Sequence, residues 1–320
     1  MATTTGRTRG RIAVRVAAAA ITAALVGTGT TAVAADAPHT PSAFEAAQNA
    51  KGTKDAKDTK SRNGLAAAPS AEAGDEDFTF HPLFGVDRSD WSWMYLPNGK
   101  GGFTERIELG PMPRLKSATL VDNNADGTAD GMWSWDYNGN LRYAGDEVED
   151  EFRVGGGWNI YDKVLSPGNL GGAKSADLLA RDKSGTLYLY LGYGNGKLTS
   201  RYKVGGGWGQ YTQIAGNGDL TGDGKADIVA RDRAGTLWLY KGTGNHKSPF
   251  EARTKIGGGW NTYNTILSSG DVNLDGKPDL LGRDSAGALY LYKGTGDAKS
   301  PFKQRVKIGN SGWNTYRLMF

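Results

Sequence analysis

The 320-residue sequence predicts an all-β domain, a five-bladed β-propeller with four-stranded blades. Three observations lead to this prediction. One unit recurs without gaps over residues 168–194, 218–244 and 270–296. A Gly-Trp-x-x-Tyr motif follows the repeats, with its tryptophan at positions 158, 208, 260 and 313. A repeat period of about 50 residues is typical of propellers and other stacked arrays.

Each unit reads as four short strands separated by turn signals. Residues 260–267 illustrate the first strand, and the preceding unit supplies examples of the second (226–231), third (236–240) and fourth (253–256). The third strands, such as LWLY at 237–240, place leucines on one face and aromatic residues on the other. Both faces are therefore apolar, as in a sheet packed between two other sheets. Radially packed blades provide that environment.

The two ends of the repeat region complement each other. The first unit, from about residue 78, lacks a first strand, and the chain ends on GWNTYRLMF at 312–320, a first strand without the rest of its unit. Pairing the C-terminal strand with the N-terminal blade closes the ring and removes its exposed sheet edges. The predicted units are 78–110 with 313–320, 111–157, 158–207, 208–259 and 260–312.

The N-terminus has the pattern of a secretory signal peptide over residues 1–35. Four arginines within 1–15 precede an apolar run at 16–30, and Ala32-Val33-Ala34 supplies a small-x-small cleavage site. A membrane anchor is the alternative, but the run is short and no basic stop-transfer cluster follows it; no other segment could span a bilayer. Residues 36–77, rich in Ala, Lys, Asp, Ser, Thr and Pro, form a disordered linker or pro-segment. The chain is therefore predicted to be secreted.

Composition excludes stabilisation by disulfides and argues against a nucleic-acid partner. The chain has no cysteine, so disulfides cannot stabilise a secreted domain, which must rely on its core with or without metal. Its formal net charge is +4, and four arginines lie in the predicted signal peptide. The repeat region thus has both signs of charge interspersed and no basic stripe, which argues against a nucleic-acid partner.

The strongest chemical motif is D-x-[DN]-x-D-G-x-x-D, which occurs three times. Side-chain oxygens at positions 1, 3, 5 and 9 and a carbonyl at position 7 form a cage of hard ligands when the glycine turns the backbone, as calcium requires. We predict about three structural Ca²⁺ sites. The ligands are Asp122, Asn124, Asp126, Thr128 and Asp130; Asp219, Thr221, Asp223, Lys225 and Asp227; and Asp271, Asn273, Asp275, Lys277 and Asp279. The third unit keeps only Asp177 of this pattern and is expected to bind no metal.

The GDLTGDGKADIVARD type of loop and strand resembles the FG-GAP or VCBS repeats of integrin-like β-propellers, which implies the fold and calcium. The stretches KIGGGWNTYNTIL and KIGNSGWNTYRLMF also resemble the tachylectins, five-bladed lectins for N-acetylated amino sugars. By that resemblance, saccharide pockets between blades would be lined by Trp158, Asn159, Tyr161, Trp208, Tyr211, Trp260, Asn261, Tyr263, Trp313, Asn314 and Tyr316. Unit four has Gly209 in place of the asparagine.

An indole can stack on a pyranose ring and an amide can hydrogen-bond to its substituents. The alternative is that each tryptophan packs between neighbouring sheets while the glycines make the turn.

A catalytic role has little support, because no nucleophile motif is present and the paired carboxylates lie in the calcium loops. We therefore expect that the protein is not an enzyme. Among catalytic alternatives, a cell-wall hydrolase is the least unfavourable. The sequence favours a secreted lectin for glycans or cell-surface polysaccharides that contain amino sugars. The alternative is a protein-interaction scaffold, such as an adhesin or the targeting subunit of a secreted assembly.

Overall fold

A computed structural model describes residues 81–320. The predicted signal peptide and the linker at 36–77 lie outside the described residues. Within 81–320, no helix is long and apolar enough to cross a membrane.

The described chain folds into five sheets of four strands, all paired antiparallel. The first strands of the blades are β4 (Leu115–Val121), β8 (Tyr161–Gly168), β12 (Tyr211–Ala215), β16 (Tyr263–Leu267) and β20 (Tyr316–Met319). The second strands are β1 (Leu83–Asp87), β5 (Gly131–Asp136), β9 (Asp177–Asp182), β13 (Ile228–Asp232) and β17 (Leu280–Asp284). The third strands are β2 (Trp91–Tyr95), β6 (Leu141–Gly145), β10 (Leu187–Tyr190), β14 (Leu237–Tyr240) and β18 (Leu289–Tyr292). The fourth strands are β3 (Ile107–Pro111), β7 (Phe152–Gly155), β11 (Tyr202–Gly205), β15 (Thr254–Gly257) and β19 (Val306–Gly309).

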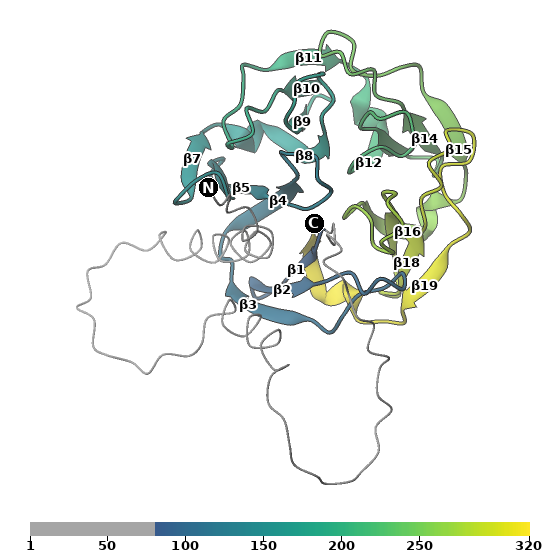
Figure 1. Cartoon of the computed structure of the whole chain (residues 1–320). Helices are drawn as coiled ribbons and strands as arrows, with labels where there is room; N and C mark the ends of the chain where they lie inside the picture. The colour runs from purple at the N-terminus through teal and green to yellow at the C-terminus, as the bar shows by residue number, and fades with distance from the viewer. Residues whose placement is uncertain (1–80) are drawn as a thin grey trace, which may run out of the picture.

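The sheets stand as blades around a ring (Figure 1). Blade 1 consists of β20, β1, β2 and β3, and blades 2 to 5 follow in chain order from β4. The first strands of all five blades line a narrow central channel of about 70 Å³. The predicted fold class, an all-β propeller with five four-stranded blades, is confirmed.

The predicted closure of the ring is also confirmed. Strand β20 pairs with β1, and Val86 lies opposite Leu318. The backbone N–H of Phe84 donates to the carbonyl of Phe320 at 2.8 Å, and the two phenyl rings stack with centroids 5.2 Å apart. The last strand of the chain thus completes the first blade.

The core lies between the blades, as the apolar pattern of the third strands requires. Leu237 and Leu239 of β14 are each 1% exposed, and they pack with Trp260 and Tyr263 of the next blade. The opposite face of β14 carries Trp238 and Tyr240, which pack toward blade 3. Each sheet therefore presents its leucine face to one neighbour and its aromatic face to the other.

One predicted boundary is wrong. The first strand was expected over 260–267, but β16 begins at Tyr263, and Trp260–Thr262 form a single 3₁₀ turn, η3. The residue before it, Gly259, has φ 84°, a left-handed conformation that glycine adopts at no steric cost. The same turn precedes β8, β12 and β20, as η1 (Trp158–Ile160), η2 (Trp208–Gln210) and η4 (Trp313–Thr315).

Candidate functional site

The aromatic residues of the Gly-Trp-x-x-Tyr motif lie mostly in the core between blades. Trp158 and Trp208 are 6% exposed and Trp260 is 7% exposed. The ring centroid of Trp260 lies 4.5 Å from that of Tyr292, whose hydroxyl is 2.8 Å from the Tyr263 hydroxyl. Trp313 alone among the four is half-buried, whereas the paired tyrosines are all buried, namely Tyr161, Tyr211, Tyr263 and Tyr316. The buried rings pack between blades, as the packing alternative predicts, and Trp313 is partly exposed.

The asparagines of the motif lie at the seams between blades. Asn159, Asn261 and Asn314 sit against the hairpin-turn glycine of the preceding blade, where a Cβ on Gly235 would come within 2.6 Å of the Asn261 side chain. Asn314 Nδ2 also donates to the Ser285 carbonyl at 2.7 Å. The asparagine positions thus join blade to blade, and their amides remain partly accessible to solvent.

An arginine that the sequence reasoning missed joins three of the four 3₁₀ turns, η2, η3 and η4, to the blade before each. Arg231 Nη1 donates to the Trp260 carbonyl at 3.0 Å and to the Tyr263 carbonyl, and its side chain is buried. Arg181 and Arg283 make the same pair of bonds to the following blade. The Arg-Asp dipeptide in three repeat units was the available signal.

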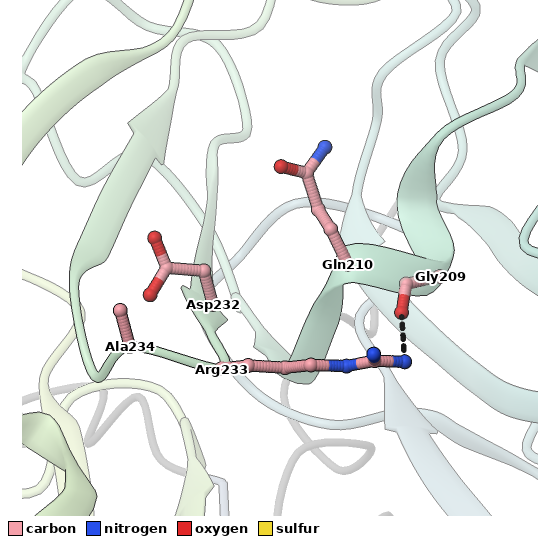
Figure 2. A pocket seen from close by; sticks show the side chains of 5 residues that line it. All are labelled: Gly209, Gln210, Asp232, Arg233 and Ala234. Atoms are coloured by element: carbon pink, nitrogen blue, oxygen red, sulfur yellow. Dashed lines mark hydrogen bonds between the residues drawn. The ribbon is translucent and has the colours of Figure 1, made fainter.

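Blade 4 contains an open recess of about 470 Å³ (Figure 2). Its lining is the blade-4 recess set, namely Gly209, Gln210, Asp232, Arg233 and Ala234. In Figure 2 the side chains of Asp232 and Gln210 rise on opposite sides of the space, and Arg233 reaches across to the Gly209 carbonyl at 3.4 Å. The recess adjoins Gly209, the position where the other units carry asparagine.

An aromatic and a cationic side chain adjoin the recess. The Trp238 indole N–H donates to Asp232 Oδ2 at 2.8 Å, and the Arg253 guanidinium lies 4.1 Å from the centroid of the Trp238 ring. Arg253 Nη1 also donates to Gln210 Oε1 at 3.2 Å. Desolvation opposes ionisation of Asp232, but hydrogen bonds from Trp238 and from the Thr236 backbone N–H outweigh it and lower the pKa. The recess therefore combines a carboxylate, an amide and two guanidinium groups beside an indole.

The three predicted calcium loops adopt one arrangement. In the loop 219–227, Asp227 Oδ1 accepts the Gly242 N–H at 2.8 Å and Oδ2 accepts the Leu220 N–H at 3.0 Å. Asp219 accepts the N–H of Gly224 at 2.5 Å. The loop 271–279 repeats these contacts through Asp279 and Asp271, and in the loop 122–130 Asp122 accepts the corresponding N–H of Gly127. In each loop, the position-9 aspartate thus accepts a hydrogen bond from the backbone N–H of the second loop residue.

The third unit separates the structural role of position 9 from metal binding. Asp177 accepts the N–H of Leu170 at 2.9 Å, of Gly171 at 2.7 Å and of Gly192 at 3.0 Å, although its loop has no other carboxylate. The aspartate therefore supports the fold in a loop that lacks the remaining ligands. The other aspartates of the three complete motifs are not needed for this contact.

The donor set of those motifs fits calcium in its chemistry, because every predicted ligand is a carboxylate, amide, hydroxyl or carbonyl oxygen. In residues 81–320, however, no three acidic or histidine side chains converge closely enough to hold a metal ion. An ion bound to the loop 219–227 would therefore have to draw Asp223 toward Asp219 and Asp227. Asp223 Oδ2 lies 3.3 Å from the Lys241 ammonium group.

The position-9 carboxylates predict how stability depends on pH in the metal-free chain. Burial raises the pKa of Asp279 to about 7 and of Asp130 and Asp227 to about 6, and repulsion from a neighbouring loop aspartate adds to each. Between the usual pKa near 3.8 and these values the folded state binds more protons than the unfolded state, so stability falls as pH rises. We expect the Tm of the metal-free chain to be lower at pH 8 than at pH 5, and Asp279→Asn to reduce the difference. A Tm that rises over this range would contradict the assignment.

Residues 219–282 match the model of the FG-GAP-like repeat family. A comparison with curated proteins found no match. Similar solved structures include an Agrocybe aegerita lectin that recognises non-reducing terminal N-acetylglucosamine, with 16% identity over 75% of this chain and 84% of that chain and a TM-score of 0.42. The BP39L lectin from Burkholderia pseudomallei is 13% identical over 73% and 72% of the chains, with a TM-score of 0.44. A mutant of AofleA from Arthrobotrys oligospora is 8% identical over 74% and 76%, with a TM-score of 0.43.

Similarity at this level supports no inference about the ligand of this chain. The matched residues begin between β12 and β13 of blade 4 and end within β17 of blade 5. The chain is a five-bladed β-propeller, and one segment of it, residues 219–282, matches the FG-GAP-like repeat model.

Proposed function

We propose that this propeller is a secreted binding module that recognises glycans containing amino sugars through the blade-4 recess. The observation that carries the proposal is the set of planar polar groups on Gln210, Asp232 and Arg233, which lie around one open space beside Trp238. Sugar hydroxyls both donate and accept hydrogen bonds, and an amide can pair with an acetamido group. A shallow site with several such groups suits a saccharide better than an apolar ligand, which prefers an enclosed apolar pocket.

We further propose that the three complete aspartate loops bind structural calcium. The loops hold carboxylates whose mutual repulsion an ion would relieve, and their ligands are all oxygens. Asp227 and Asp279 accept the N–H of Gly242 and of Gly294 beyond the third strand of their blades, so an ion held at these two loops would stabilise the blades. Calcium in this role supplies rigidity and no chemistry.

A protein-interaction scaffold is the second candidate, and exposed tyrosines favour it. Tyr193 is 63% exposed and Tyr202 is 39% exposed, both in blade 3, and Tyr137 of blade 2 is 62% exposed. Tyrosine is enriched in protein interfaces, where its ring packs and its hydroxyl forms hydrogen bonds. These residues lie outside the blade-4 recess, so changing them separates the two functions.

A glycan array tests the proposal directly. The chain is applied with calcium and again after chelation, and a melting curve is recorded in each condition. We expect saturable binding to N-acetylated sugars with calcium, and a lower Tm without it. Because anything that binds only the folded state stabilises it, calcium should raise the Tm in a concentration-dependent way.

The outcomes separate the candidates. Calcium-dependent stability without any glycan binding would favour the protein scaffold, and replacement of Tyr193 and Tyr202 by serine should then abolish capture of the protein partner. A Tm that is the same with calcium and with chelator would contradict the calcium proposal alone. Glycan binding that persists in a stable metal-free chain would leave the lectin proposal intact and remove calcium from it.

A further inference from the structure

The outermost strands of three consecutive blades carry the same pair of cations around an aromatic ring. Arg253 precedes β15 and lies over the Trp238 ring, while Lys255 is the register partner of Trp238. Blades 3 and 5 repeat the arrangement, with guanidinium-to-ring distances of 4.5 and 4.7 Å. We call these the basic clusters: Arg201, Tyr188 and Lys203; Arg253, Trp238 and Lys255; Arg305, Tyr290 and Lys307.

The arginine of each basic cluster donates a hydrogen bond to a tyrosine hydroxyl of the same blade. Arg305 Nη1 donates to the Tyr263 hydroxyl at 2.7 Å, and Arg201 Nη1 donates to the Tyr161 hydroxyl at 3.1 Å. Arg253 makes the same contact with Tyr211. Each contact uses one donor of the guanidinium group, and stacking on the ring fixes its plane. A guanidinium group has five N–H donors, so others are left for a ligand.

These cations lack acidic partners in the part of the chain that the structure describes. None of the three arginines or three lysines lies within ion-pair distance of a carboxylate there. The nearby hairpin-turn carboxylates, Asp182 and Asp232, accept N–H bonds from their own turns. Each cluster therefore sets two cations against at most one carboxylate that is already hydrogen-bonded.

The other two blades lack the full cluster. In blade 1, Arg106 stacks over Trp93 at 4.0 Å, but Glu108 occupies the position of the lysine. In blade 2, Arg142 occupies the position of the aromatic residue and forms an ion pair at 2.9 Å with Glu151, which occupies the position of the arginine, while Arg153 occupies the position of the lysine. The arrangement of two unpaired cations around an aromatic ring is thus confined to blades 3, 4 and 5 of the described chain.

We propose that the three basic clusters bind the anionic groups of an acidic glycan. This inference rests on the proposed glycan-binding function and names the class of glycan. A guanidinium fork pairs with a carboxylate or sulfate in a bidentate geometry, and the lysine adds a second positive charge. The clusters are separate, one to a blade, which suits a polymer with spaced charges better than a nucleic acid, which requires a continuous basic stripe. Three weak sites on one rigid ring gain affinity through avidity.

Titration calorimetry with hyaluronan octasaccharide and its carboxyl-reduced form tests the inference, because the two probes share N-acetylglucosamine and differ in charge. We expect Kd for the reduced form to be at least about tenfold higher, and Kd for the native form to rise with salt as screening shortens the reach of the cations. Equal Kd values for the two forms would overturn the acidic-glycan inference and leave the proposed function standing. Binding of neither form, with no binding to chitin oligosaccharides, would overturn both.

Matched variants test which lysines contribute to binding of the octasaccharide. The triple change Lys203→Gln, Lys255→Gln and Lys307→Gln should raise the Kd for the native octasaccharide about tenfold. The control triple change Lys197→Gln, Lys247→Gln and Lys299→Gln removes the same charge from exposed loops of the same blades and should leave Kd unchanged. Equal effects of the two triple variants would overturn the assignment to the basic clusters.

Two further arms sharpen the result. Glu108→Lys should create a fourth cluster around Trp93 and lower Kd for the native octasaccharide. A single-stranded DNA probe should bind more weakly than the octasaccharide at the same salt concentration. Tighter binding of DNA would overturn the choice of a glycan as the ligand.

Discussion

Replacing Arg231 by methionine should lower the free energy of unfolding by about 3 kcal/mol. The guanidinium group is buried and donates to two carbonyls of the next blade and, through Nε, to Thr212 Oγ1 at 3.0 Å. Methionine fills a similar volume but donates nothing, so the carbonyls of Trp260 and Tyr263 lose their charged donor in a site from which water is excluded. The Trp260 N–H would still donate to the Gly235 carbonyl of blade 4 at 3.0 Å, so the turn would keep this backbone bond and its packing but lose the bonds from Arg231.

Urea unfolding measures this loss, and two variants bracket it. Arg233→Met changes an exposed arginine two residues away and should alter stability by no more than about 0.5 kcal/mol. Arg231→Lys should retain part of the stabilisation that Arg231 provides, because a lysine can donate to such a carbonyl. Lys116 does so to the Tyr161 carbonyl at 2.7 Å, at the corresponding seam between blades 2 and 3. If Arg231→Met and Arg233→Met were equally stable, the interblade bonds would not contribute as described.

Deleting residues 313–320 should abolish the folded state. The segment carries β20, in which Tyr316 is 4% exposed and Met319 is 9% exposed, and it supplies the Phe320 ring that stacks on Phe84. Burial of each such side chain contributes about 1.5 to 3 kcal/mol. Their sum is comparable to the whole stability of a typical domain, about 5 to 15 kcal/mol. The deletion also leaves β1 as an open sheet edge.

Circular dichroism and a melting curve of the truncated chain test this expectation. A cooperative transition at the wild-type Tm would contradict ring closure as the source of stability. Two point variants refine the test. Leu318→Pro removes an N–H beside Val86 and should destabilise strongly, whereas Arg317→Ala removes only a partly exposed ion pair with Asp90 and should cost at most about 1 kcal/mol.

The number of blades and their closure could be predicted because both depend on periodicity and on two incomplete ends that complement each other. The start of the first strand could not, because Trp260 and Asn261 belong to a 3₁₀ turn that is set by the positive φ of Gly259. A strand pattern and a turn followed by a strand share the same apolar spacing over these few residues. Only the tertiary contact with the Gly235 turn decides between them.

In the candidate site, too, some features could be predicted from the sequence and others depend on tertiary contacts. Side chains of the aspartate loops are local to one turn, so their spacing in the sequence indicates their chemistry. Burial of Trp158, Trp208 and Trp260 depends on the neighbouring blade, which periodicity does not describe. The blade-4 recess depends on the absence of a side chain at Gly209 and on the reach of Arg233, and a missing side chain produces no motif.

The central claim, glycan binding at the blade-4 recess, is tested most directly by titrating the glycan selected on the array into the wild type and a double variant. Gln210→Thr with Arg233→Ser gives blade 4 the residues that blade 5 carries at these positions, Thr262 and Ser285. The Thr262 hydroxyl already donates to its Gly259 carbonyl at 3.0 Å, as the Gln210 amide does to Gly207, so the fold should persist. Thr262→Ala serves as the control. We predict a rise in Kd of at least about tenfold for the double variant at an unchanged Tm; an unchanged Kd at an unchanged Tm would contradict the claim.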